Sequence, residues 1–471
     1  MNYLDRIDSY KEEMIGALQE LIAIPGVAGA AEGDAPFGKD VQRALDFMLE
    51  KGRQDGFIAV NVDNHAGHLE FYGNDSGKTM GILAHLDVVP AGEGWERPPF
   101  GGQVEDDRIY GRGTSDDKGP LLAAYFAMKA LKEEGFVPDG RIRLILGLDE
   151  EAGTGWQSLK AYFKEQAYPD FGFTPDADFP VIHAEMGILI FDLVKKIGKF
   201  ATGQGVELSS LTGGNAPNMV ADRARAVIQA PDYTEIKDML ADYREETGHV
   251  IKAKGVGKGL EILAEGVSSH GARPGDGVNA ISILLEFFSR IRFANEDVAD
   301  FIEFYKQHIG FDLHGERIGC SFSDEVSGKL LFNVGKIQID QKTARLTVNI
   351  RYPVTGAGEA VYEAMAPALD RYGFGVVKLD HQLPIFIPED DPLIVTLMEV
   401  YRRHSGDLTS PPMVIGGGTY ARAAKNVVAF GMSYPGQPVL AHQKDESVSI
   451  DELLLATKIY AEAIYELTKP V

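Results

Sequence analysis

The sequence predicts an α/β fold with a mostly parallel sheet, into which an α+β domain is inserted. Apolar runs of strand length alternate with amphipathic helices over roughly the first 150 residues, an order typical of parallel sheets. The middle of the chain has a different texture, with short strands and separate helices. The length of 471 residues is also about three times that of a typical single domain, which has roughly 150 residues.

The N-terminal part of the main domain alternates helices and strands. The first helix breaks at Pro25 and Gly26, and its apolar face comprises Leu4, Ile7, Met14, Leu18 and Leu21. A second helix surrounds residues 41–52, and a third begins with Pro120 at its first position and ends at Gly135. Three apolar runs predict strands, at residues 67–72, 79–83 and 141–148.

The change of texture marks the inserted domain. It contains short strands and two amphipathic helices, at residues 278–290 and 359–372. After it, a helix with a capping box formed by Ser449 and Glu452 returns to the first layer. The sequence therefore predicts a main domain in two parts, residues 1–186 and 385–471, and an inserted domain, residues 187–384.

Charge and cysteine content exclude several classes of protein. Acidic residues outnumber basic ones by 70 to 46, and the net charge of −24 disfavours nucleic acid and membranes as partners. Cys320 is the single cysteine, which excludes an internal disulfide and a thiolate zinc cluster. There is no signal-peptide pattern, and no apolar run approaches the ~18 residues of a membrane helix. We therefore expect a cytoplasmic protein.

Candidate metal ligands follow two of the predicted strands. His85 and Asp87 end one run, where a period of two places both side chains on one side of the chain. An imidazole there can bind a metal while a carboxylate orients it, although a structural pair is the alternative. Glu150 and Glu151 follow Asp149 after the next run. Three like charges repel one another unless a cation offsets them, the alternative being a solvated acidic turn.

A glycine-rich turn provides two more acids. Residues 111–120 read Gly-Arg-Gly-Thr-Ser-Asp-Asp-Lys-Gly-Pro, with Asp116 and Asp117 just before a helix. A P-loop needs Gly-Lys-Ser/Thr, and two carboxylates would repel phosphate, so a cation fits better; a capped helix start is the alternative. Asp176 and His442 lie further along the chain. Together, these imidazoles and carboxylates suit one or two zinc-like ions.

In this order, the motifs resemble those of the dinuclear zinc aminoacylase, carboxypeptidase G and desuccinylase family of metallopeptidases. The similarity spans essentially the whole chain and is greatest to the peptidase V-type dipeptidases, which resemble carnosinases. The matching motifs are His85-x-Asp87-x-Val, Gly111-Arg-Gly-x-x-Asp-Asp-Lys-Gly119, Glu150-Glu151, Asp176 and His442. Further similar segments are Val-Val-Pro-Ala-Gly-Glu-Gly-Trp95, Ile415-Gly-Gly-Gly-Thr-Tyr420 and residues 460–468.

The resemblance implies two metal ions in a metallopeptidase catalytic domain. One ion would be held by His85 and Asp176. The other would be held by Glu151 and His442, and Asp116 would bridge the two. The ions would be Zn²⁺, with Mn²⁺ as the alternative, because oxygen-rich ligation permits both.

The resemblance also implies roles for residues beside the metal ions. Glu150 would be the general base, and Asp87 would orient the histidine ligand of the first ion. Asp117 would lie next to the ligands, at the end of a peptide bond that is cis in relatives.

Residues of the inserted domain, which the resemblance makes a lid, would contact the substrate. His270, in Gly266-Val-Ser-Ser-His-Gly-Ala-Arg-Pro274, matches a lid histidine, and a surface loop is the alternative. Asn218 matches a substrate-binding asparagine, with Asn215 as its rival. Arg351 matches an arginine that receives a terminal carboxylate together with the backbone of Gly416, Gly417 and Gly418; a strand-end salt bridge is the alternative. Residues 295–327 match nothing in the family pattern.

These matches imply a dipeptidase that acts as a monomer. A pocket that ends at Arg351 would admit two residues and reject longer peptides. The insert of about 200 residues is long enough to imitate the lid that a partner supplies in dimeric relatives. The alternatives are an N-acyl amino acid deacylase with the same metals, and a non-catalytic binding module, which would usually have lost ligands or the base.

Overall fold

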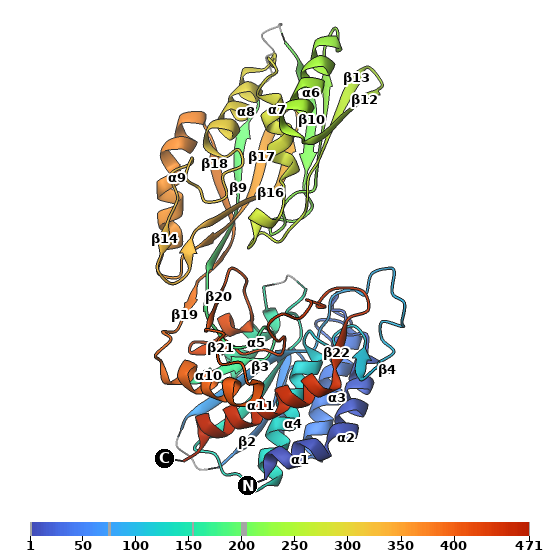
Figure 1. Cartoon of the computed structure of the whole chain (residues 1–471), viewed down its shortest axis with the longest axis vertical. Coiled ribbons are helices and arrows are strands. Elements are labelled where there is room, and N and C mark those ends of the chain that lie inside the picture. The colour runs from blue at the N-terminus through green and yellow to red at the C-terminus, as the bar shows by residue number, and fades with distance from the viewer. Residues whose placement is uncertain (1, 74–76, 153–154, 199–204, 471) are drawn as a thin grey trace. The chain divides into compact units, whose positions relative to one another are not determined.

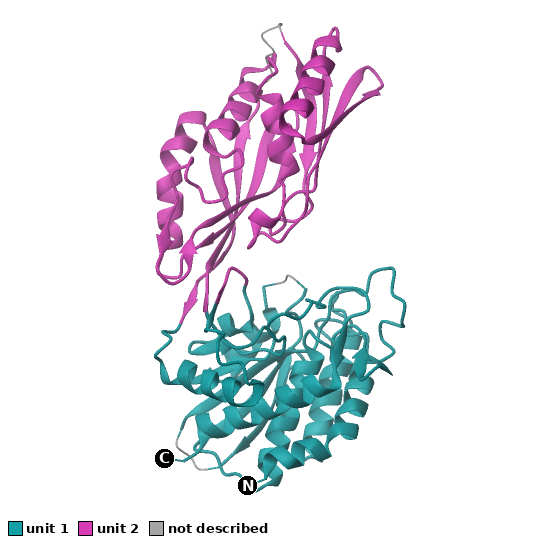
Figure 2. Cartoon of the chain, viewed as in Figure 1, with its two compact units in different colours: residues 1–183, 387–413, 418–471 teal, residues 184–386, 414–417 magenta. Residues whose placement is uncertain are grey.

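The computed structural model describes residues 2–73, 77–152, 155–198 and 205–470 (Figure 1). The chain divides into two compact units, each with its own hydrophobic core (Figure 2). Unit 1 comprises residues 1–183, 387–413 and 418–471, and unit 2 comprises residues 184–386 and 414–417. The sequence predicts an insert over residues 187–384, whereas the short segment 414–417 belongs to the predicted main domain.

The central sheet of unit 1 is mixed. Its strands follow the order β1-β2-β6-β3-β7-β21-β8-β19, and β20 pairs with β8. Their bounds are β1 (Ile58–Val62), β2 (Ala66–Tyr72), β3 (Thr79–His85), β6 (Arg141–Gly147), β7 (Phe171–Thr174), β8 (Ile182–Glu185), β19 (Ile385–Phe386), β20 (Met413–Ile415) and β21 (Val427–Ala429). The central strands β6, β3, β7 and β21 are parallel, and the flanking β1–β2, β2–β6, β21–β8 and β8–β19 pairs are antiparallel. The α/β class is confirmed, with parallel pairing confined to the centre.

Helices and a small three-stranded sheet surround this sheet. They are α1 (Tyr3–Ser9), α2 (Lys11–Ile22), α3 (Lys39–Gln54), α4 (Lys118–Glu133), α5 (Gln157–Glu165), α10 (Pro392–Ser405), the 3₁₀ helix η2 (Tyr420–Ala423), α11 (Ile450–Thr468) and the strands β4 (Gln103–Glu105), β5 (Arg108–Tyr110) and β22 (Ser447–Ser449). Helix α4 is buried over nearly all of its length, which is typical of a helix inside a core. The helix begins directly after Asp116 and Asp117.

Two details of the predicted helices are wrong. The first predicted helix is in fact α1 and α2, because Tyr10 forms a turn between them. Tyr10 is buried, and its hydroxyl donates a hydrogen bond to Glu133. Helix α11 does begin after Ser449, but no side-chain hydrogen bond caps it. Ser449 belongs to β22, and Glu452 accepts a hydrogen bond from Gln437 instead of closing a capping box.

Unit 2 contains an antiparallel eight-stranded sheet with helices over one face (Figure 1). The strand order is β12-β13-β11-β10-β16-β17-β9-β18. The bounds are β9 (Gly187–Lys196), β10 (Glu207–Gly213), β11 (Arg223–Gln229), β12 (Val250–Val256), β13 (Gly259–Glu265), β16 (Leu331–Ile339), β17 (Thr343–Tyr352), β18 (Gly375–Gln382), α6 (Thr234–Thr247), η1 (Pro274–Asp276), α7 (Ala280–Phe288), α8 (Glu296–His308) and α9 (Gly358–Tyr372), with a β14 (Ser323–Asp324) and β15 (Gly328–Lys329) hairpin. Apolar residues alternate along the strands and pack beneath the helices.

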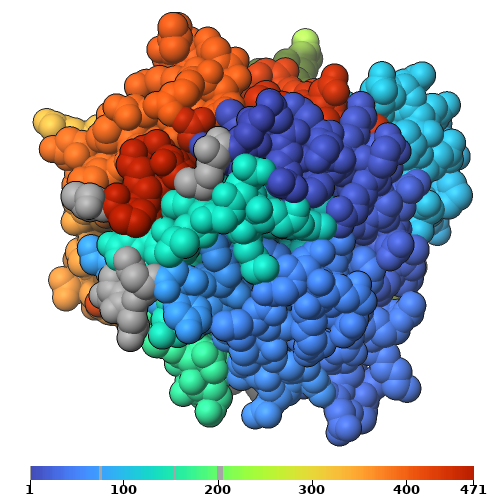
Figure 3. Space-filling view, turned by 90° about the horizontal axis from the view of Figure 1, so that it is seen from below, coloured from blue at the N-terminus to red at the C-terminus, as the bar shows by residue number. Residues whose placement is uncertain are grey.

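The first and last helices of the chain pack together in unit 1. The rings of Tyr3 and Tyr465 lie 5.7 Å apart, and Figure 3 shows both terminal segments on one face. Among the described residues, no helix is long and apolar enough to cross a membrane.

Candidate metal centre

Three of the predicted metal ligands and the predicted general base lie at the carboxyl ends of neighbouring parallel strands. His85 is the last residue of β3, Glu150 and Glu151 follow β6, and Asp176 follows β7. Ligands of open α/β sheets bind at this edge, because the turns that leave parallel strands converge there. Two further segments reach it: the turn before α4, with Asp116, and the loop before β22, with His442.

Asp116 lies between the two imidazoles. Its Oδ1 is 3.2 Å from His85 Nε2, and its Oδ2 is 3.0 Å from His442 Nε2. Asp176 Oδ2 is 3.5 Å from the same nitrogen of His85, and Glu151 Oε1 is 2.7 Å from that of His442. The donor atoms of each imidazole and its two carboxylates therefore lie within 4.8 Å of one another, with Asp116 shared.

One ring nitrogen of His85 makes a hydrogen bond, and the other faces carboxylates. Its Nδ1 lies 2.9 Å from the backbone oxygen of Asp87, which can only accept, so this nitrogen carries the proton of the neutral ring. The buried Nε2 has no hydrogen-bond partner and faces Asp116 and Asp176. Burial lowers the pKa of His85, but the contacts with these two carboxylates outweigh it and raise the pKa well above its usual range. A lone pair facing two carboxylates is repulsive unless a cation or a proton lies between them. The donor set therefore fits a divalent metal ion.

Burial and crowding of like charges shift the pKa values of these groups. Burial raises the pKa of Glu150 well above its usual range, and the charges of Asp176 and Glu151 act in the same direction against the opposing effect of His85. Contacts with Asp116 and Glu151 raise the pKa of His442 to about 10. Without metal ions, protons thus offset part of the negative charge.

Asp87 contacts the site in a way that the sequence does not reveal. Its carboxylate accepts hydrogen bonds from the backbone N–H of Glu150 (3.0 Å) and of Glu151 (2.9 Å). The same carboxylate lies 3.5 Å from His85 Nδ1, whose bond goes to the Asp87 carbonyl. Asp87 therefore fixes both the histidine and the acidic turn.

The glycine-rich turn has a conformation that needs its glycines. Gly113 has a φ of +93°, and a Cβ at Gly119 would lie 2.0 Å from the carbonyl oxygen of Thr114. The peptide bond between Asp116 and Asp117 is cis. Asp117 is buried, and its carboxylate accepts a hydrogen bond from the backbone N–H of His85 at 2.9 Å.

One aromatic contact of the site was missed by the sequence reasoning. The buried ring of Tyr420 meets the ring of His85 edge to face, with centroids 5.9 Å apart. Tyr420 belongs to the glycine-rich 415–420 segment, so the motif was identified but the contact was not.

The predicted residues of the insert form a group of their own within unit 2. The backbone carbonyl oxygen of Asn218 accepts a hydrogen bond from the backbone N–H of Gly271 at 2.7 Å, next to His270. Arg351 Nε donates to the side chain of Asn349 at 3.0 Å. Burial lowers the pKa of His270, and the charge of Arg351 lowers it further.

His270 is arranged as a hydrogen-bond donor. The backbone N–H of Ala272 donates to His270 Nδ1 at 3.3 Å, so the neutral ring carries its proton on Nε2. Gly416 belongs to the same unit, where a Cβ on it would lie 2.9 Å from that of Ala272. Gly417 also belongs to unit 2, and Gly418 belongs to unit 1.

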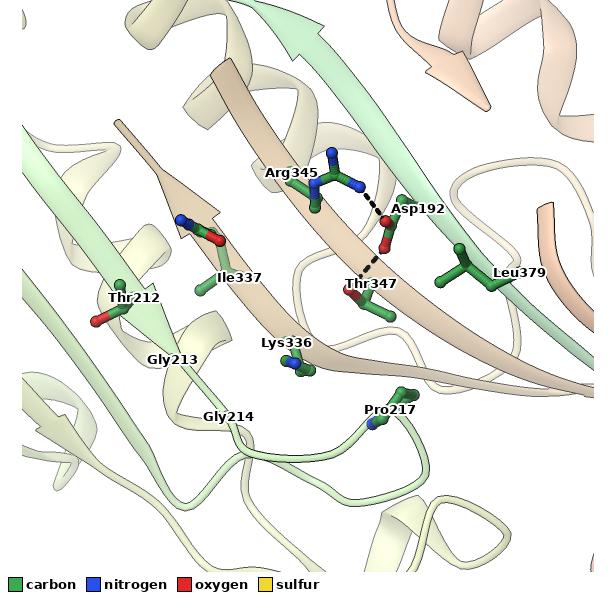
Figure 4. A pocket seen from close by; sticks show the side chains of 11 residues that line it. Asp192, Thr212, Gly213, Gly214, Pro217, Lys336, Ile337, Arg345, Thr347 and Leu379 are labelled. Carbon is green, nitrogen blue, oxygen red and sulfur yellow. Dashed lines mark hydrogen bonds and ion pairs between the residues drawn. The ribbon is translucent and has the colours of Figure 1, made fainter. Parts of the chain in front are cut away.

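A pocket of about 390 Å³ lies elsewhere in unit 2, on strands β9, β10, β16 and β17 and beside β18 (Figure 4). Figure 4 shows the buried Asp192 paired with Arg345 and accepting a hydrogen bond from Thr347 at 2.7 Å. The residues that line the pocket include none of the predicted site residues. The carboxylate of Asp192 is satisfied by neighbouring side chains of unit 2.

Comparisons with known proteins identify the family of the chain. Residues 81–466 match "Peptidase family M20/M25/M40". "Putative dipeptidase YtjP" of Bacillus subtilis (strain 168) is 37% identical over the full length of both chains. Human carnosine dipeptidase 1 (TM-score 0.57, 15% identity, 99% of this chain and 98% of that chain) and aminoacylhistidine dipeptidase from Vibrio alginolyticus (TM-score 0.58, 15% identity, 97% and 96%) share the fold. The chain therefore belongs to the M20/M25/M40 peptidase family.

Proposed function

We propose that this protein is a metal-dependent dipeptidase that hydrolyses the peptide bond of unsubstituted dipeptides. The observation that carries the proposal is the sharing of Asp116 between two imidazole–carboxylate groups at the sheet edge. Membership of a peptidase family and a full-length relative named as a dipeptidase support the same activity. We also propose that the protein is cytoplasmic. A chain with a single cysteine forms no internal disulfide and therefore needs no oxidising compartment.

The residues that would hold two metal ions follow from the two groups. His85 and Asp176 would hold one ion. Glu151 and His442 would hold the other, with Asp116 between them. Nitrogen and oxygen ligands suit Zn²⁺ and also permit Mn²⁺. A pair of such ions supplies Lewis-acid polarisation of a carbonyl group and lowers the pKa of water.

Glu150 would move the proton. It lies close enough to His85 and Glu151 to reach a water molecule at the metal centre, from which it would accept a proton and pass it to the leaving amine. The bond from its backbone N–H to Asp87 keeps the turn in place during this transfer.

Residues of unit 2, with Gly418 of unit 1, would contact the substrate's C-terminal carboxylate and its reacting carbonyl group. The guanidinium of Arg351, with backbone amides of Gly416–Gly418, would bind the C-terminal carboxylate, since this planar fork matches a carboxylate. His270 would donate from Nε2 to the oxyanion, and Asn218, whose backbone contacts the His270 loop, would contact the substrate. We also propose a monomer, because the insert of about 200 residues is long enough to imitate the lid that a partner supplies in dimeric relatives.

The first test is metal removal. A chelator should abolish the release of free amino acids from dipeptides, and Zn²⁺ or Mn²⁺ should restore it, because the ligands cannot activate water alone. The measurement is amino acid release from a panel of dipeptides, with N-acyl amino acids as the comparison. Full activity in a metal-stripped sample would contradict the metal requirement, and preference for N-acyl amino acids would show a deacylase.

A second test concerns the terminal carboxylate. The change Arg351→Ala should raise KM for dipeptides by about 10- to 100-fold, as expected for losing a charged hydrogen bond of roughly 1.5–3 kcal/mol. Arg225→Ala is the matched control, because Arg225 lies on the same sheet and pairs with Glu261 on the surface.

Amidated substrates complete this test. Amidation of the substrate's C-terminus should reduce cleavage by the wild type far more than cleavage by Arg351→Ala. Equal wild-type cleavage of free and amidated dipeptides would refute the proposed role of Arg351.

A further inference from the structure

A buried ion pair lies beside the candidate metal centre in unit 1. Glu446 is fully buried, the side chain of Arg112 is only 2% exposed, and Glu446 Oε2 is 2.6 Å from Arg112 Nη1. Burying two charges costs free energy unless their remaining hydrogen-bonding capacity is also satisfied. The further contacts of this pair show what it organises.

The Glu446 carboxylate accepts several hydrogen bonds from the turn that ends at Asp116. Its Oε1 accepts hydrogen bonds from the backbone N–H groups of Gly113 (3.1 Å), Ser115 (2.9 Å) and Asp116 (3.3 Å), and from Ser115 Oγ (3.0 Å). The carbonyl oxygen of Glu446 accepts a further bond from Gly111 at 2.8 Å. One residue therefore fixes most of the turn that carries the shared aspartate.

Arg112 connects the same turn to the loop that contains His442. Its Nη2 donates to the backbone oxygen of His442 at 3.3 Å and to that of Ala91 at 3.4 Å. Its guanidinium lies 5.2 Å from the ring centre of Trp95. The ion pair thus joins two segments about 330 residues apart in the sequence, each of which carries one predicted ligand.

We propose that Glu446 and Arg112 are positioning residues that set the separation of Asp116 and His442 before a metal ion binds. The inference rests on the proposed metal site. The two predicted ligands face each other at 3.0 Å, and their backbones are tied to the two ends of one ion pair. Groups that orient ligands typically change metal affinity by about 10- to 100-fold when they are replaced.

Titration of metal-free protein with Zn²⁺ against a chromophoric chelator tests this role. Glu446→Gln should weaken one of the two binding steps by about 10- to 100-fold, because the neutral amide loses the pairing that fixes the turn. The affected step should be the one that His442→Ala removes. Thermal unfolding of the metal-free variants measures stability separately.

A second ion pair provides a matched control. Glu70 and Arg143 are also buried in unit 1, with the same separation of 2.6 Å, but they join β2 to β6. Glu70→Gln should lower the unfolding temperature of the metal-free protein and leave both Zn²⁺ steps unchanged. Equal losses of Zn²⁺ affinity in the two variants would show a general structural effect and overturn the proposal, as would wild-type binding by Glu446→Gln.

A milder variant tests the proposal if Glu446→Gln folds poorly. Arg112→Lys keeps the charge but lacks the fork that reaches both Glu446 and the His442 carbonyl, so it should weaken the same Zn²⁺ step. Unchanged Zn²⁺ binding by Arg112→Lys would also overturn the proposal, and so would a wild type that binds no Zn²⁺. A wild type that binds two ions but cleaves no dipeptide would overturn the proposed function alone.

Discussion

Replacing Glu150 with glutamine should lower kcat for dipeptide hydrolysis by about 10²–10⁴-fold while both metal ions stay bound, as expected for the loss of a general base. Glutamine keeps the size of the side chain and the backbone bond to Asp87, but it cannot accept the proton. The measurement is kcat with metal content determined on the same sample.

Glu151→Gln is the control for this prediction. Glu151 is the next residue of the same turn, but its Oε1 lies 2.7 Å from His442, within the second group of predicted ligands. We therefore expect this variant to lose metal. Because His85, Glu150 and Glu151 also come close enough to bind an ion together, equal metal loss in both variants would show that Glu150 is a ligand.

The strand-end part of the site could be predicted from sequence because it depends on local patterns. Apolar runs mark β3 and β6, and the side chains that follow parallel strands meet at one edge. The same patterns do not report strand direction. The run at residues 67–72 is a strand, but β2 pairs antiparallel with β6.

Contacts between distant segments could not be predicted in this way. The carboxylate of Asp87 meets backbone groups 63 and 64 residues away, and Glu446 meets Arg112 from a distance of 334 residues. No periodicity links such positions, because each partner lies in an irregular turn. No local pattern connects Asp176 or His442 with the other ligands either, and only the resemblance assigned them as ligands.

The second large effect concerns His270. His270→Ala should lower kcat by about 10²–10³-fold, because an oxyanion donor acts only when charge develops on the carbonyl oxygen. The bond from Ala272 to Nδ1 leaves Nε2–H as the donor. KM should change little, and metal content should not change. His249→Ala, at a histidine of unit 2 that stacks on Phe311, should keep wild-type kcat.

A mixing experiment shows whether this histidine acts within its own chain. Inactive His270→Ala and inactive Glu150→Gln each keep the residue that the other lacks. If one chain supplies both residues to its own substrate, the mixture contains no complete site, and kcat stays at the level of the separate variants. If a partner copy supplied His270, a mixed pair would contain one intact site, and activity would return as the two variants are titrated together. Recovery would therefore contradict the monomer that we propose, whereas the loss in His270→Ala alone would still identify the donor.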